Sequence, residues 1–206
     1  LVLAIENGIG TIVVDNLYEI EMIENICRAL DKTQKVLLRT NPGVEAHTHS
    51  FIQTSKIDSK FGFALRNEET IQAINAINNT TCVKFAGFHC HIGSQIFDKN
   101  AFSLAVEIVT DYVKMIKETY NIEVDELNFG GGFGVHYSGD DPKFSINDYC
   151  QYIETLTKTL TSAVERKNIK KPFFMIEPGR SIVGEAGITL YSVGAIKEIK
   201  GIKKYL

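Results

Sequence analysis

Val83-Lys-Phe-Ala-Gly-Phe88 is the stretch that decides the fold, because this apolar, strand-like run is followed by a long segment with the apolar spacing of a helix. The helical segment carries one apolar stripe, made of Phe102, Ala105, Val106, Val109, Val113 and Ile116. Strand and helix together make one β-then-α unit. The chain repeats this order on both sides of the unit.

Four further strand-like runs surround this unit, at residues 11–14, 35–39, 126–129 and 172–176. The helices between them are expected to begin at Asn16, near Asn67 and at Ser145. Asn16 and Ser145 each have an acidic residue three positions later, which is the spacing of a capping box. The whole chain is therefore expected to alternate between strands and helices.

Alternation at this pace predicts a parallel sheet with helices packed outside it, either an open doubly wound sheet or an eight-fold barrel. Five strands would make only part of a barrel. After Gly187 the pattern changes to a β-rich stretch, residues 188–199, without an amphipathic helix. We therefore expect an α/β domain over residues 1–186 and the beginning of a second, mainly β domain over residues 187–206.

Composition narrows the class of protein. The chain has 206 residues, of which 44% are hydrophobic and 23% charged, as in an ordinary soluble protein. Its 22 basic and 25 acidic residues are scattered, which argues against a nucleic-acid partner. No apolar run approaches the ~20 residues of a membrane span. The four cysteines form no Cys-x-x-Cys pair, which argues against a disulfide framework and favours a reducing cytoplasm.

Residues that packing does not explain follow the predicted strands. They are Arg39, the segments 89–95 and 130–134, and the turn Glu177-Pro-Gly-Arg180. In a parallel barrel the carboxyl ends of the strands meet at one mouth, where active sites are built. We therefore expect these four loops to form one site.

Gly130-Gly-Gly132 leaves the backbone without side chains at a strand end, so its N–H groups can approach a phosphate. Ser94 can add a hydroxyl donor. A tight turn without any ligand explains the triplet equally well. A dinucleotide fingerprint fits less well, because the glycine spacing differs and no acidic partner for a ribose follows an obvious next strand.

Glu177-Pro-Gly-Arg180 places a carboxylate, a rigid turn and a guanidinium at the end of an apolar strand. A carboxylate that ends a buried strand must have a partner. If it faced a pyridine nitrogen, it would keep that nitrogen protonated and make the ring an electron sink. Arg180 suits bidentate capture of a substrate carboxylate. The alternative is a surface salt bridge across the turn, which the apolar neighbours Ile182 and Val183 disfavour.

His89 and His91 lie two residues apart and share a face if the strand continues, a spacing that also suits a metal. His47 and His49 could supply further nitrogen ligands, but no acidic residue other than Glu177 holds a comparable strand-end position. We interpret His91 as an imidazole that stacks on a cofactor ring. We interpret His89 as an ordinary buried histidine and the cysteine between the two as a core residue.

Three segments resemble the alanine-racemase-like, fold-type-III decarboxylases that depend on pyridoxal phosphate: residues 87–98, 127–134 and 177–183. Within that family, His91-Ile-Gly-Ser-Gln-Ile96 is similar to the branch that acts on diaminopimelate. Ornithine and arginine decarboxylases usually carry His-Val-Gly-Ser-Gly there. The resemblance covers essentially the whole chain. It implies a partial TIM-type (β/α)8 barrel of the alanine-racemase-like kind.

The resemblance also implies a function. The cofactor would be pyridoxal 5′-phosphate, and the reaction would be decarboxylation of the amino acid meso-2,6-diaminopimelate to L-lysine and carbon dioxide. The intact enzyme would be a cytoplasmic homodimer with no membrane or nucleic-acid partner and no metal.

Roles for individual residues follow from the same resemblance. Arg39 would lie near the pyridine side of the cofactor, and His91 would stack on its ring. Glu177 would pair with the pyridine nitrogen, so that His91 and Glu177 would be the catalytic residues. The phosphate would be bound by Ser94, Gly131, Gly132 and the turn Pro178-Gly179-Arg180. Arg180 would also bind the substrate carboxylate.

Parts of the family pattern are missing from this sequence. It holds no Tyr-x-x-Lys-Ala-Asn segment for the Schiff-base lysine, and the catalytic cysteine and cofactor-contacting tyrosine belong to a C-terminal β domain. Together with a beginning that lacks Met, this predicts a fragment that is inactive alone. The rival interpretations are an ornithine- or arginine-type decarboxylase, a metal-dependent barrel hydrolase and a non-catalytic binding homologue.

Overall fold

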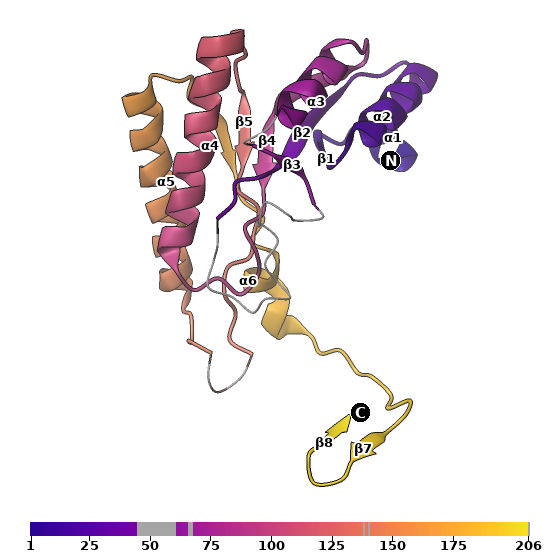
Figure 1. Cartoon of the computed structure of the whole chain (residues 1–206), viewed down its shortest axis with the longest axis vertical. Coiled ribbons are helices and arrows are strands. Elements are labelled where there is room, and N and C mark those ends of the chain that lie inside the picture. The colour runs from indigo at the N-terminus through magenta and orange to yellow at the C-terminus, as the bar shows by residue number, and fades with distance from the viewer. Residues whose placement is uncertain (45–60, 66–67, 138, 140, 206) are drawn as a thin grey trace.

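The computed structural model describes residues 1–44, 61–65, 68–137, 139 and 141–205 (Figure 1). The helices are α1 (Val2–Glu6), α2 (Leu17–Leu30), α3 (Glu69–Asn78), α4 (Lys99–Tyr120), α5 (Ile146–Lys167) and α6 (Gly179–Val183), followed by a 3-10 turn (Gly184–Ala186). The strands are β1 (Thr11–Val14), β2 (Gln34–Asn41), β3 (Phe63–Ala64), β4 (Val83–Cys90), β5 (Glu126–Asn128), β6 (Phe173–Met175), β7 (Lys197–Ile199) and β8 (Lys203–Tyr205). His47, His49 and the helix start expected near Asn67 lie outside the described residues.

The first six strands form one parallel sheet in the order β1-β2-β4-β5-β6, with β3 beside the end of β2. Strand order thus follows chain order, without the reversal at which a doubly wound sheet switches direction. The sheet is therefore part of a barrel, as the resemblance implies, and the doubly wound alternative is wrong. All of its carboxyl ends lie along one edge.

One face of this sheet carries the hydrophobic core. Val36 and Leu38 of β2 belong to it, as do Phe88 of β4 and Leu127 of β5, and α1 to α5 all contribute apolar side chains to the same cluster. Because side chains alternate along a strand, the residues between these point to the opposite face, which is the interior of a barrel. There Glu126 pairs with Lys35 of β2.

The helix starts follow the capping signals in the sequence. Ser145 and Asp148 form a complete capping box at the start of α5. At α2 the side chain of Asn16 accepts a hydrogen bond from the backbone N–H of Glu19 at 3.1 Å. The Glu19 carboxylate returns to the N–H of Asp15 at 2.6 Å, one residue earlier than in a capping box. Both helices therefore begin where the spacing predicts.

Glu24 fastens α2 to the start of β4. Its side chain is only 10% exposed and accepts hydrogen bonds from Arg28 Nε at 2.6 Å, Thr81 Oγ1 at 2.8 Å, Cys82 N at 2.9 Å and Thr81 N at 3.1 Å. Burial alone would raise the pKa of Glu24, but these hydrogen bonds outweigh it and lower that pKa to about 2. Glu24 is thus an anion held by fixed donors.

The residues after α6 lead away from the sheet to the antiparallel β7–β8 hairpin, seen at the bottom of Figure 1. Of the β-rich stretch 188–199, only β7 forms a strand. A second domain over residues 187–206 stays a prediction. Among the residues that the structure describes, no helix is both long and apolar enough to cross a membrane.

Candidate active site

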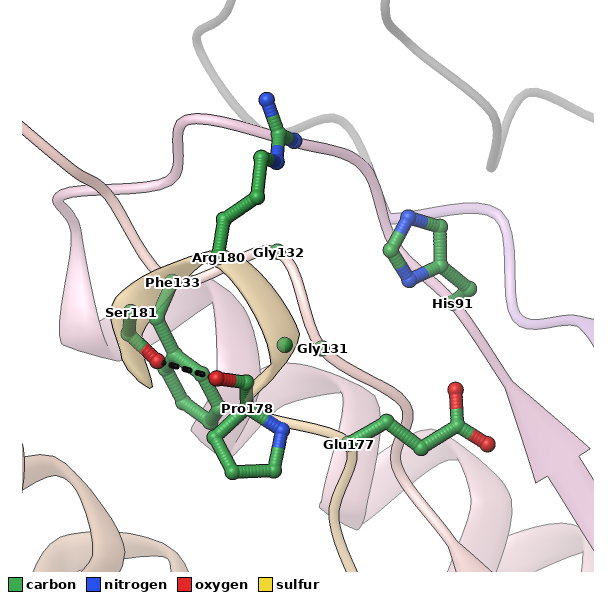
Figure 2. A pocket seen from close by; sticks show the side chains of 9 residues that line it. His91, Gly131, Gly132, Phe133, Glu177, Pro178, Arg180 and Ser181 are labelled. Atoms are coloured by element: carbon green, nitrogen blue, oxygen red, sulfur yellow. Dashed lines mark hydrogen bonds between the residues drawn. The ribbon is translucent and has the colours of Figure 1, made fainter. Parts of the chain in front are cut away.

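A cavity of about 250 Å³ opens at the carboxyl edge of the sheet, beyond the ends of β4, β5 and β6. Its lining comes from three of the four loops that the sequence singles out: His91, Gly131, Gly132, Phe133, Glu177, Pro178, Gly179, Arg180 and Ser181. Figure 2 shows His91 and Glu177 on one side of the two central glycines and Arg180 on the other. The expected convergence is therefore observed for three of the four loops, and Arg39 is not part of the lining.

His91 follows the last residue of β4 and is partly buried beside the cavity. Burial lowers the pKa of its imidazole, and the nearby Arg39 guanidinium, His89 and Arg180 lower it further, against an opposing effect of Glu177. The ring is therefore held in its neutral form near pH 7. A neutral, flat imidazole at a cavity wall suits stacking on an aromatic ring.

The glycine loop packs directly on the two neighbouring loops. A Cβ on Gly131 would lie 2.1 Å from the carbonyl oxygen of Glu177, and a Cβ on Gly132 would lie 1.9 Å from that of Gly93. Gly132 also has φ +97°, where other residues are strained. Loop packing thus requires both glycines, whatever binds here. Gly179 differs, since a Cβ there would meet no atom within 4 Å.

The Ser-Gln-Ile segment after His91 is fastened to the glycine loop by paired hydrogen bonds. The Gln95 amide donates to the Val135 carbonyl at 2.9 Å and accepts from the Val135 N–H at 3.0 Å. Ile96 makes two backbone hydrogen bonds to the same loop, one to the Gly132 carbonyl and one from the Gly134 N–H. Gln95 has φ +59°, a conformation that favours glycine. Its paired hydrogen bonds offset that cost.

Glu177 follows β6, and its side chain is 51% exposed, so the expectation of a buried strand end is wrong. The reason is that β6 is the last strand of the described sheet and has a paired neighbour, β5, on one side only. The carboxylate accepts a hydrogen bond from Asn128 Nδ2 at 3.0 Å and lies 3.4 Å from His89 Nε2. The hydrogen bond from His89 lowers the pKa of Glu177. The charge interaction with His89 and the hydrogen bond from Asn128 lower it further, and together these effects outweigh burial, which raises it.

Arg180 lies in the first turn of α6, with its guanidinium 3.4 Å from the hydroxyl of Tyr137. No ion pair joins it to Glu177 within the described part of the chain. The salt-bridge explanation of this turn therefore has no support. The argument from apolar neighbours is nevertheless wrong, because Ile182 and Val183 are 71% and 62% exposed.

Two predicted residues are not among those that line the cavity. Ser94 lies in the loop after His91 but does not face this space. Arg39 lies further off, with Nε 3.7 Å from Asp15 Oδ1 and its guanidinium over the ring of Phe61. Arg39 still acts on the site through its charge, which lowers the pKa of His91.

The structure adds residues that sequence reasoning missed. Phe133 and Ser181 line the cavity, while Asn128 and His89 hold the Glu177 carboxylate. His89 is buried as predicted but is not a mere core residue. The sequence held a signal for both of these residues. His89 lies two positions before His91 and Asn128 two positions before Gly130, so strand alternation turns both side chains to the barrel interior. His89 and Asn128 are direct partners in the β4–β5 register.

The cysteine between the two histidines behaves as expected. Cys90 is buried in the core cluster, and burial raises the pKa of its thiol to about 12, with the Glu177 charge adding to the effect.

Over the residues that the structure places, no group of three or more His, Cys, Asp or Glu could hold a metal ion.

Glycine backbone, a neutral imidazole and a carboxylate meet at the mouth of a parallel part-barrel, an arrangement that suits a domain binding a phosphorylated pyridine cofactor. The chain belongs to the family described as pyridoxal-dependent decarboxylase, pyridoxal binding domain, whose model matches residues 1–184. The cofactor of this family is pyridoxal 5′-phosphate.

Curated relatives are diaminopimelate decarboxylases. The one from Staphylococcus aureus (strain COL) is 46% identical over 203 residues, and the one from Bacillus subtilis (strain 168) is 43% identical over 204 residues. These matches cover 98% and 99% of this chain but 46% of each relative, so the chain spans a little under half their length. The crystal structure of diaminopimelate decarboxylase from M. jannaschii in co-complex with L-lysine matches with a TM-score of 0.77 and 32% identity. That match covers 98% of this chain and 45% of the other.

Proposed function

We propose that this chain is the cofactor-binding barrel of a decarboxylase that converts meso-2,6-diaminopimelate to L-lysine and carbon dioxide. The observation that carries the proposal is the convergence of His91, Glu177 and Arg180 with three glycines on one cavity. The substrate is supported by the relatives, which are diaminopimelate decarboxylases along the whole length of this chain. The M. jannaschii structure holds L-lysine, the proposed product.

The donor set fits pyridoxal phosphate in each of its parts. The neutral His91 ring can cover one face of the pyridine, and the Glu177 anion can accept a hydrogen bond from its protonated nitrogen. Gly131, Gly132 and Gly179 expose backbone rather than side chains to the cavity, as a phosphate cradle requires. Such a cradle would join the two loops that we expect to share the phosphate.

When bound, pyridoxal phosphate supplies an electron sink for the electron pair left on Cα when the bond to the carboxylate breaks. Glu177 makes the sink effective by keeping a proton on the ring nitrogen. Arg180 orients the substrate by a bidentate contact to a carboxylate. His91 remains neutral, so it adds no positive charge that would compete for the Glu177 anion.

The proposal is tested with the full-length enzyme. Incubation with meso-2,6-diaminopimelate should release equal amounts of lysine and carbon dioxide, whereas ornithine and arginine should react far more slowly. Faster turnover of ornithine or arginine would assign the protein to the other branch of the family. The chain of 206 residues alone should show no turnover, because it lacks the Schiff-base lysine segment.

Glu177→Gln in the full-length enzyme tests the role of the anion. Glutamine keeps the shape of the side chain but not its charge, so the ring nitrogen should lose its proton. Turnover should fall far more than cofactor affinity, as steady-state kinetics and a spectroscopic titration with pyridoxal phosphate can compare. Near-normal turnover would mean that Glu177 does not face the ring nitrogen.

We extend the proposal to a homodimer in the cytoplasm, which the family resemblance supports. Light scattering of the purified full-length protein should give twice the mass of one chain. A monomer that retains full turnover would contradict the proposed homodimer.

A further inference from the structure

Asn128 connects two parts of the cavity with one side chain. Its Nδ2 donates to Glu177 Oε1 at 3.0 Å, and its Oδ1 accepts the backbone N–H of Gly130 at 2.8 Å. Because only the oxygen of the amide can accept from an N–H, the second contact fixes which way the amide faces. Its NH₂ group must then point at the carboxylate.

His89 reaches the same oxygen from the neighbouring strand. Its side chain is 7% exposed, and its Nε2 lies 3.4 Å from Glu177 Oε1. Its Nδ1 is buried without a hydrogen-bond partner in the described part of the molecule. To donate to the carboxylate, Nε2 must carry a proton, which it does in one neutral tautomer and in the charged ring alike.

Both donors therefore meet on Oε1, and no hydrogen bond to Oε2 occurs among the described residues. Glu177 itself is half exposed and lines the cavity beside His91 (Figure 2). A glutamate in such a position would otherwise rotate about its side-chain bonds. The two donors hold one oxygen in place and leave the other for a ligand in the cavity.

We propose that Asn128 and His89 are positioning residues that clamp Glu177 Oε1, so that Oε2 meets the protonated ring nitrogen of the cofactor. Asn128 also links this carboxylate to the glycine loop, so the ring-nitrogen contact and the phosphate cradle are set by one amide. The inference rests on the proposed function only in taking pyridoxal phosphate as the ligand. It does not depend on which amino acid is decarboxylated.

The depressed pKa of Glu177 agrees with this arrangement, since the His89 and Asn128 hydrogen bonds are among its causes. The groups that interact with the carboxylate come from β4 and the loop after it, which supply His89, His91 and the neutral Cys90 thiol, and from β5, which supplies Asn128. None of them carries a negative charge. The site therefore favours an anion at Glu177 over the neutral range of pH.

The test uses the full-length protein loaded with pyridoxal phosphate that carries ¹⁵N in its ring, without substrate. In the unaltered protein the nitrogen signal should be that of a protonated pyridine. Asn128→Ala removes the donor to Glu177 Oε1 without adding a charge, so the carboxylate can rotate away from the ring nitrogen. The ring signal should move toward the unprotonated form, and turnover should fall about tenfold or more.

His89 offers a matched pair of substitutions. In His89→Gln the amide nitrogen can occupy the place of Nε2, whereas in His89→Asn the shorter side chain cannot reach Glu177. His89→Asn should therefore shift the ring-nitrogen signal and lower kcat, and His89→Gln should recover most of both. Cofactor affinity should change less than kcat, because the phosphate cradle remains.

Equal loss in His89→Gln and His89→Asn would show a merely structural histidine and overturn its part of the proposal. An unshifted ring-nitrogen signal in Asn128→Ala would overturn the part of Asn128. Failure of the proposed function has a different signature, which is a loaded protein with a protonated ring nitrogen that does not release lysine from diaminopimelate.

Discussion

Gln95 should hold the glycine loop in place at the cost of a strained backbone, and two substitutions can separate these effects. Gln95→Ala removes both hydrogen bonds to Val135 and keeps a non-glycine residue at φ +59°. Gln95→Gly removes the same bonds but relieves the strain. We therefore expect alanine to be more damaging than glycine, although alanine is the smaller chemical change.

The magnitudes follow from the contacts. The two hydrogen bonds contribute about 1 kcal/mol each, so Gln95→Ala should lower the free energy that holds the glycine loop in place by about 2 kcal/mol. A left-handed conformation costs a non-glycine residue roughly 1–2 kcal/mol, and the greater freedom of glycine in the unfolded chain returns roughly 0.5–1 kcal/mol of that. The loss in Gln95→Gly should therefore be about 1 kcal/mol.

Amide hydrogen exchange at Gly134 measures the effect, because this N–H donates to the Ile96 carbonyl, a hydrogen bond between the same two loops that both variants keep. Its protection in the cofactor-free protein should fall about 30-fold in Gln95→Ala and about 5-fold in Gln95→Gly. Amides of α3, which lie elsewhere on the sheet, serve as the control and should not change. Unchanged protection at Gly134, or a smaller loss for alanine than for glycine, would refute this account of Gln95.

Glu24→Gln should lower the free energy of unfolding by about 3 kcal/mol at pH 7, because the Glu24 pKa falls from 4.5 to about 2 on folding. This stabilisation is complete above pH 4.5 and is lost as the pH falls toward 2. Urea unfolding should therefore show a smaller difference between Glu24→Gln and the unaltered protein at pH 3 than at pH 7. A difference independent of pH would contradict the role of the Glu24 anion. Gly132→Ala should reduce both stability and cofactor binding, whereas Gly179→Ala, whose Cβ meets no atom within 4 Å, should weaken binding of pyridoxal phosphate without altering thermal unfolding. Arg180→Lys should raise the Michaelis constant about tenfold with less effect on kcat, because a point charge replaces a bidentate clamp; a fall in kcat alone would point to another role.

The fold could be predicted to the level of β/α units because its signals are local. Helical spacing of apolar residues, strand runs and the capping pair Ser145 and Asp148 all act within a few positions of one another. The choice between a barrel and a doubly wound sheet was not local, since it depends on which strands become neighbours. The resemblance to a family supplied what periodicity could not.

The site was predictable as a set of loops but not as a set of contacts. His91, Gly131, Gly132 and Arg180 meet because parallel strands end at one edge. The exposure of Glu177 depends instead on its place after β6, which is an edge strand of the described sheet. Its bond to Asn128 depends on strand pairing that no single segment encodes.

The arrangement of the cavity also constrains when it can form. His91 and Arg180 are separated along the chain by α4, β5, α5 and β6, and each strand must pair before the loop after it is in place. Contacts between such distant segments form slowly, because the intervening chain must be ordered first. On a ribosome, the pocket would be complete only after α6 has emerged. Binding of pyridoxal phosphate to nascent chains of increasing length would therefore report the moment at which β6 joins the sheet.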